Sequence, residues 1–180
     1  GRVQASHDES VRIGTARAKP GEKAPSPVLL AGAKGTLRAL ALTADDSTIA
    51  AAGDEGKIFL WSIEDGKLLR TIDAHSAPVL SLAADPRGNT LLTGSADKTV
   101  RVWDVNAGKL LTTLTGHEAA VRSVAVLPGG RWAISGSSDR TLRLWDLWGK
   151  VEVAAFRKHN GPVVSAPFLS KGHPTFSGAR

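Results

Sequence analysis

Residues 116–146 read GHEAAVRSVAVLPGGRWAISGSSDRTLRLWD, and this stretch decides the fold. Residues 74–104, AHSAPVLSLAADPRGNTLLTGSADKTVRVWD, align with it without a gap. Self-similarity at a fixed period is the signature of a repeat architecture, so the chain is built from copies of one structural unit. Two residue types recur every 42 residues, the histidines His75, His117 and His159 and the tryptophans Trp61, Trp103 and Trp145.

Each copy predicts four short strands separated by turns. The strand segments are rich in Val, Leu, Ile and Thr, which suit a pleated surface, whereas Asp, Pro, Gly and Asn gather in the turns. The alternation in Val100-Arg101-Val102 places an arginine between two valines that share the opposite face. In the copy that begins at His75, the expected strands are 79–83, 90–94, 100–104 and 110–114.

Four strands in a period of 42 residues, opened by Gly-His and closed by Trp-Asp, resemble the WD-repeat (WD40) β-propeller family. The opening pair stands at Gly116-His117, and the closing pair stands at Trp103-Asp104 and Trp145-Asp146. The resemblance implies an all-β propeller of four-stranded antiparallel blades. About four periods are present, with incomplete blades at both ends, which indicates a piece of a longer propeller.

The repeat divides this single propeller domain into five segments. Because residues 1–5 and 175–180 match the same strand, the two ends have the register needed to close a ring of four blades. The alternative is an open arc, whose uncovered blade edges would make the isolated chain self-associate. The segments are a partial degenerate blade over 1–30 with a Pro-rich loop at 16–27, a degenerate repeat over 31–72, repeats over 73–114 and 115–156, and a partial repeat over 157–180.

Members of the family hold each blade with a hydrogen-bonded chain of Asp, His, Ser or Thr, and Trp. A buried polar chain of this kind is favourable only when every member has a partner. The unit around Trp61 has Ala33, Ala51 and Glu55 at the other positions, so we expect its blade to rely on apolar packing. The resemblance assigns the chain to His75, Thr93, Asp97 and Trp103, to His117, Ser135, Asp139 and Trp145, and in the last partial repeat to His159 and Ser177.

The recurring Ser, His and Asp suggest a hydrolase at first sight. A catalytic triad occurs once and needs an oxyanion hole, whereas this set recurs beside a Trp, as a structural device does. The chain has no Cys, and His7 and His173 lack the spacing of metal ligands. Gly53-Asp54-Glu55-Gly56-Lys57 lacks the phosphate-loop spacing. We therefore expect no catalysis, no metal and no cofactor.

The net charge of +6 lies at the two ends, because residues 31–149 hold 13 basic and 13 acidic residues. A nucleic-acid interface would interleave aromatic residues with clustered Lys and Arg, and no such pattern is visible. A basic nucleic-acid-binding propeller that uses residues 150–180 stays an alternative.

No stretch approaches about 18 apolar residues, so we expect no membrane span. The lack of Cys fits a reducing compartment, and we expect the cytoplasm.

Propellers of this family bind partners mainly through loops on one rim. The resemblance therefore implies a non-catalytic protein–protein interaction scaffold, a region of a larger, regulatory or signalling protein whose partners are other proteins or peptides. The alternative is the propeller region of a multidomain enzyme such as a protein kinase or protease. Outside the repeat positions, we expect Trp132 to pack in the core and Trp148 to be exposed. The residues expected to contact a partner are Ser76, Ala77, Ala96, Glu118, Ala119 and Ser138.

Overall fold

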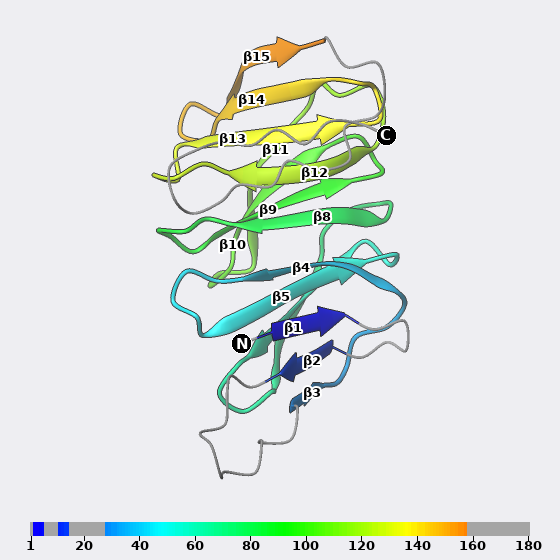
Figure 1. The fold of residues 1–180 in the computed structure, drawn as a ribbon, viewed down its shortest axis with the longest axis vertical. Coiled ribbons are helices and arrows are strands. Elements are labelled where there is room, and N and C mark those ends of the chain that lie inside the picture. Colours follow the sequence, from blue (N-terminus) through cyan, green and yellow to red (C-terminus); the bar gives the residue numbers. More distant parts are fainter. Residues whose placement is uncertain (1, 6–10, 15–27, 158–180) are drawn as a thin grey trace.

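A computed structural model describes residues 2–5, 11–14 and 28–157 of the chain. The described residues form four antiparallel sheets, and none of them forms a helix that could cross a membrane (Figure 1). The all-β propeller prediction is confirmed. The loop expected at 16–27 and the partial repeat expected at 157–180, apart from Arg157, lie outside the described residues. The first sheet has three strands, β1 (Arg2–Ala5), β2 (Val11–Gly14) and β3 (Val28–Leu30).

Three complete blades follow, each with its strands in sequence order from one edge of the sheet to the other. The predicted strand at 100–104 has its predicted bounds, and the strands expected at 79–83, 90–94 and 110–114 are each one residue longer. The blades are β4 (Leu37–Leu42), β5 (Thr48–Gly53), β6 (Lys57–Ser62) and β7 (Leu68–Asp73); β8 (Val79–Ala84), β9 (Thr90–Ser95), β10 (Val100–Asp104) and β11 (Lys109–Leu114); and β12 (Val121–Val126), β13 (Trp132–Ser137), β14 (Leu142–Asp146) and β15 (Val151–Phe156).

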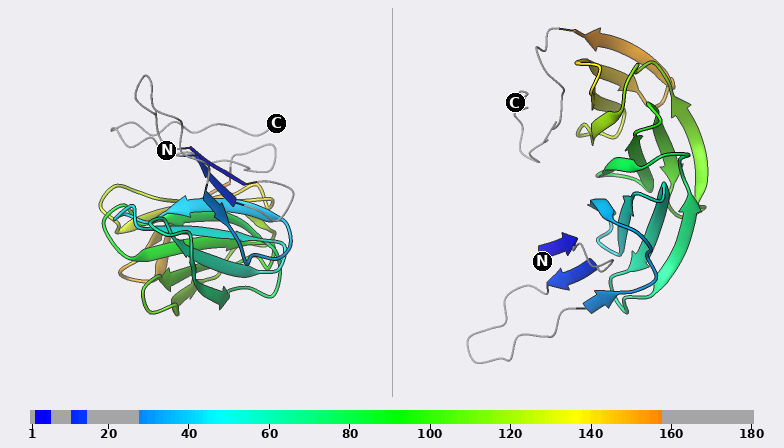
Figure 2. Two further views of the ribbon diagram at one scale, coloured as in Figure 1. Left: turned by 90° about the horizontal axis from the view of Figure 1, so that it is seen from below. Right: turned by 90° about the vertical axis from the view of Figure 1, so that its right-hand side faces the viewer.

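The blades stand side by side along an arc. Figure 2 shows β4, β8 and β12 on the concave side and β7, β11 and β15 on the convex side. The three-stranded sheet and the β12–β15 blade lie at opposite ends of the arc. Ring closure would require the residues after Arg157, which lie outside the described part of the chain, so it stays a prediction.

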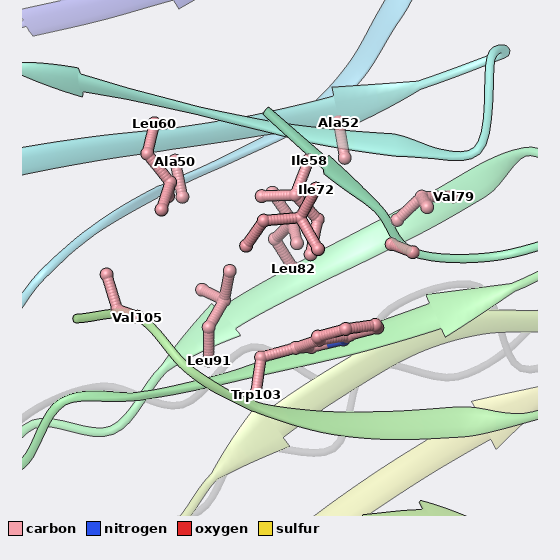
Figure 3. Packing of buried hydrophobic residues seen from close by; sticks show 11 residues of the cluster. Ala50, Ala52, Ile58, Leu60, Ile72, Val79, Leu82, Leu91, Trp103 and Val105 are labelled. Carbon is pink, nitrogen blue, oxygen red and sulfur yellow. The ribbon is translucent and has the colours of Figure 1, made fainter. Parts of the chain in front are cut away.

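The hydrophobic core lies between the blades. In Figure 3, Leu60, Ile58 and Ile72 of the first complete blade face Leu91 and Trp103 of the second. The next interface repeats this arrangement and buries Leu92, Val100 and Leu114 against Val121 and Trp145. Trp103 and Trp145 thus each pack against the preceding blade. No blade can bury both of its faces alone, and stacking therefore supplies the apolar burial that holds the fold.

The last described blade has an exposed phenylalanine on the face that would meet a following blade. Phe156 is 54% exposed, whereas Leu114 and Ile72, at the same repeat position, are 3% and 8% exposed because the following blade covers them. None of the described residues covers Phe156 in the same way. An exposed aromatic side chain at a repeat position that is buried in the other blades is suited to association.

We predict that the isolated chain self-associates, and that Phe156→Ser shifts it toward monomer because the face that would meet a following blade loses its exposed aromatic side chain. Light scattering in line with size exclusion, over a range of concentrations, measures the mass. The control is Leu111→Ser, which also changes an exposed apolar residue, on the convex strand β11. A wild-type mass equal to the monomer at every concentration would contradict the prediction.

Candidate functional site

A continuous hydrogen-bonded chain runs through the third complete blade from Trp145 to Asp139. The indole Nε1 of Trp145 donates to Ser135 Oγ at 2.8 Å, and Ser135 Oγ lies 2.7 Å from His117 Nε2. His117 Nδ1 lies 2.8 Å from Asp139 Oδ2. Every group has a partner when His117 is neutral with its proton on Nδ1, because the Ser135 hydroxyl then donates to Nε2 while it accepts from the indole.

The second blade contains the same chain with Thr in place of Ser. Trp103 Nε1 donates to Thr93 Oγ1 at 3.0 Å, and Thr93 Oγ1 lies 2.6 Å from His75 Nε2. His75 Nδ1 lies 2.7 Å from Asp97 Oδ2. The structure therefore brings together eight of the ten residues that the sequence assigned to the network, while His159 and Ser177 lie outside the described residues.

The electrostatics of both pairs favour a neutral histidine beside an ionised aspartate. Burial lowers the pKa of His117 and of His75 and outweighs the opposing influence of the neighbouring carboxylates. Burial alone would raise the pKa of Asp139, but hydrogen bonds from Thr141, the Glu118 amide and His117 together hold that pKa well below its usual range. The two directions agree with the proton lying on His117 Nδ1.

The first complete blade lacks this chain and uses apolar contacts, as expected from the sequence. Ala33 and Ala51 are buried, and the ring of Phe59 stacks on that of Trp61 with centroids 5.8 Å apart. Trp61 Nε1 donates instead to the backbone carbonyl of Ala31 at 2.9 Å. A backbone acceptor carries no residue signature, and the sequence therefore could not reveal it.

The network ends at one rim of the blades. We call this the upper rim: the loops that precede β8 and β12 (74–78 and 116–120) and the turns after β9 and β13 (96–98 and 138–140). In the third blade the Glu118 amide donates to Asp139 Oδ2 at 2.9 Å, and the Ser138 amide donates to the carbonyl of Ala120 at 2.9 Å. In the second blade the Ala96 amide donates to the carbonyl of Pro78 at 2.9 Å.

All six residues expected to contact a partner lie on this upper rim. Ser76 and Glu118 are exposed, and Ala77, Ala96, Ala119 and Ser138 are partly exposed. The hydroxyl of Ser137 also donates to the carbonyl of Ala119 at 3.0 Å. Buried polar groups thus fasten each surface loop to its neighbouring turn.

The burial of the hydroxyls argues against a hydrolytic site. Ser135 and Thr93 are both 0% exposed, and each hydroxyl is already engaged by an indole and an imidazole. A nucleophile must reach a substrate carbonyl, which these positions prevent. Within the described ranges, no cluster of three or more His, Cys, Asp and Glu side chains is arranged to hold a metal.

Opposite the upper rim, Arg131 lies near two indoles. Its guanidinium lies 4.7 Å from the ring centroid of Trp132 and 5.5 Å from that of Trp148, and Arg131 Nη2 donates to Asp146 at 2.8 Å. Trp148 is 71% exposed, as expected. The prediction that Trp132 packs in the core is wrong: it is half-buried, because it alternates with inward Ala133 and faces away from the second blade.

The described sheets and their buried His–Trp chains define a WD-repeat β-propeller. The family model for the WDR41 β-propeller matches residues 3–158, and the chain belongs to that family.

Comparison with solved propellers agrees with this assignment. The chain is similar to the structure of U3-55K, with a TM-score of 0.72 and 31% identity over 74% of this chain and 43% of that one. It is also similar to the RRP9 WD40 repeats, with a TM-score of 0.73 and 28% identity over 90% of this chain and 46% of that one. The chain therefore spans less than half of each of these structures.

Curated relatives match over shorter stretches. A periodic tryptophan protein 2 homolog from Schizosaccharomyces pombe is 43% identical over 49 residues, which is 27% of this chain and 6% of that protein. The guanine nucleotide-binding protein subunit beta-5b of Danio rerio is 38% identical over 64 residues, which is 34% of this chain and 16% of that protein.

We predict that Asp139→Ala destabilises the chain more than Glu55→Ala, the change at the same repeat position of the first complete blade. Asp139→Ala leaves His117 and the Glu118 amide without their acceptor. Loss of the partner of a buried polar group lowers the free energy of unfolding by about 1–3 kcal/mol. Glu55 is exposed and has no corresponding histidine. Urea denaturation of both variants measures the free energy of unfolding, and equal losses would contradict the network.

We also predict that stability falls as the pH drops from 7 to 5. The folded-state pKa of His75 and of His117 is lowered, so the unfolded chain takes up protons first, near a pKa of about 6.5. Their contribution is complete above that pH and is lost below it. His75→Asn/His117→Asn should flatten the dependence of the free energy of unfolding on pH. An unchanged slope in this double variant would exclude these histidines as its source.

Proposed function

We propose that the chain is a non-catalytic protein-interaction scaffold, a region of a larger regulatory or signalling protein that presents its upper rim to a partner. WD-repeat propellers generally serve as such scaffolds. The finer assignment, that this chain uses the upper rim for a regulatory partner, is supported by the way its loops are fastened.

The fastening of the loops carries the proposal. Glu118 is exposed at its side chain while its amide is bound to Asp139, and Ser138 is bound through its amide to Ala120. Side chains on pre-ordered loops lose less conformational entropy when they bind, so more of the contact energy appears as affinity. A rigid blade below a variable loop is the usual arrangement of a binding surface.

The buried hydroxyls favour the scaffold over an enzyme within these residues. If the larger protein is a multidomain enzyme, such as a kinase or protease, we place its chemistry outside this segment. The propeller would then recruit or orient a partner of that enzyme.

The test is quantitative affinity capture with the 180-residue chain as bait. We predict that partner proteins bound by the wild type are lost from the upper-rim variant Ser76→Trp/Glu118→Trp, because the added bulk blocks the rim. They should be kept by the matched variant Glu64→Trp/Asn106→Trp, which makes the same kind of changes at exposed turns on the other side of the blades. Both variants must first melt at the wild-type temperature. Identical protein sets from all three baits would contradict the proposal.

A further inference from the structure

The arginine Arg122 on the inner strand β12 lacks the ion pair that its repeat equivalent has. Two repeats earlier, Arg38 forms a salt bridge with Asp54, whose Oδ2 lies 3.1 Å from Arg38 Nη2. Ser138 occupies the repeat position of Asp54, and Arg122 Nε donates to its hydroxyl at 2.8 Å. Arg122 forms no salt bridge within the described part of the chain, so it is held in place while its charge is left uncompensated.

Next to Ser138, an open pocket of about 260 Å³ lies on the upper rim of the same blade. Its charged lining consists of two carboxylates and of three guanidinium groups, which come from the turn after β13, from β14 and from the residue after β15. The lining residues are Glu118, Asp139, Arg140, Thr141, Arg143 and Arg157.

Of the two acidic residues that line this pocket, Asp139 is engaged in internal contacts, whereas the Glu118 carboxylate is exposed and forms no salt bridge within the described residues. Asp139 accepts hydrogen bonds from Thr141 and the Glu118 amide and pairs with His117. Arg143 pairs with Glu152 through Nη1, its side chain is only 8% exposed, and its buried Nε has no hydrogen-bond partner among the described residues. The guanidinium groups of Arg140 and Arg157 are exposed to solvent, and they line the same pocket as the buried, paired Arg143.

The backbone at Arg140 supports a role for its charge. Its φ is +67°, in the left-handed region that favours glycine, and the first blade has Gly56 there with φ +70°. A non-glycine residue in this region carries a backbone strain that glycine avoids. A binding role for the positive charge of Arg140 on the rim would explain why an arginine occupies this strained position.

The basic character is strongest in this blade. At the repeat positions of Arg140, Arg143 and Arg157, the first complete blade has Gly56, Phe59 and Asp73. The second blade has Lys98, Arg101 and Thr115. The equivalent positions of the three blades thus become more basic from the first complete blade to the third.

We propose that this arginine surface, formed by Arg122, Arg140, Arg143 and Arg157, docks an acidic segment of a partner protein, rich in Asp and Glu. Planar guanidiniums bind carboxylates bidentately, and such charge-assisted hydrogen bonds are among the strongest polar contacts in proteins. The pocket is polar and shallow, which suits the side chains of an extended peptide. This inference rests on the proposed function and names the partner class for the same rim.

The test uses a fluorescein-labelled ten-residue glutamate peptide and the full chain, followed by fluorescence anisotropy at low and moderate salt. We expect saturable, salt-sensitive binding that weakens about tenfold or more in Arg140→Gln/Arg157→Gln. Ser138→Asp should also weaken binding, because it recreates the Arg38–Asp54 pair at Arg122. The control Arg87→Gln/Lys150→Gln removes the same net charge from exposed turns on the other side and should bind as the wild type does.

Three outcomes would overturn the proposal: no binding to the wild type, equal weakening by the control, or tighter binding of a labelled single-stranded oligonucleotide that is lost in the same arginine variants. The last result would assign the surface to nucleic acid. If the peptide does not bind but the affinity capture still depends on Ser76 and Glu118, only the acidic partner is excluded. If the capture also fails to depend on them, the scaffold proposal fails as well.

Discussion

The structure depends on a chain of buried hydrogen bonds that joins Trp145 to Asp139 through Ser135 and His117. Each side chain is the hydrogen-bond partner of the next. Removal of one therefore leaves its neighbours without a partner in a site that water does not reach. The chain fixes two features at once. Its indole end packs into the core against the preceding blade, and its carboxylate end holds the loop before β12. Stacking of the blades and ordering of the upper rim are therefore coupled through the same four side chains.

The first complete blade shows how a propeller blade forms without that chain. Trp61 keeps its place in the core, but its indole donates to the carbonyl of Ala31, and alanines fill the positions of His and Ser. This solution packs the blade without fastening a turn to a loop through buried side chains. Within one chain, the blades thus differ in how firmly their upper loops are held. We infer that the second and third blades, which keep the complete hydrogen-bond network from Trp to Asp, are the ones suited to present a partner surface.

The 42-residue period was sufficient to predict the strands, because turn residues and alternating apolar residues repeat with it. It also indicated which His, Ser or Thr, Asp and Trp side chains the fold would bring together. Besides the backbone acceptor of Trp61, two features could not be predicted. The half-buried position of Trp132 depends on which face of β13 meets the neighbouring blade, and a single strand does not specify this. The arginine surface was hidden because charges over 31–149 balance along the chain, and only the fold shows that Arg38 pairs with Asp54 whereas Arg122 meets the hydroxyl of Ser138.

The most direct test of the coupling between network and rim is the hydrogen-exchange rate of the Glu118 amide, measured by NMR. This amide lies next to an exposed side chain and is protected only by its bond to Asp139 Oδ2. The account predicts slow exchange in the wild type and fast exchange in Asp139→Ala, while the Ala96 amide in the second blade stays protected by the carbonyl of Pro78. Fast exchange of Glu118 in the wild type would contradict the account, since the loop would then be free of the network.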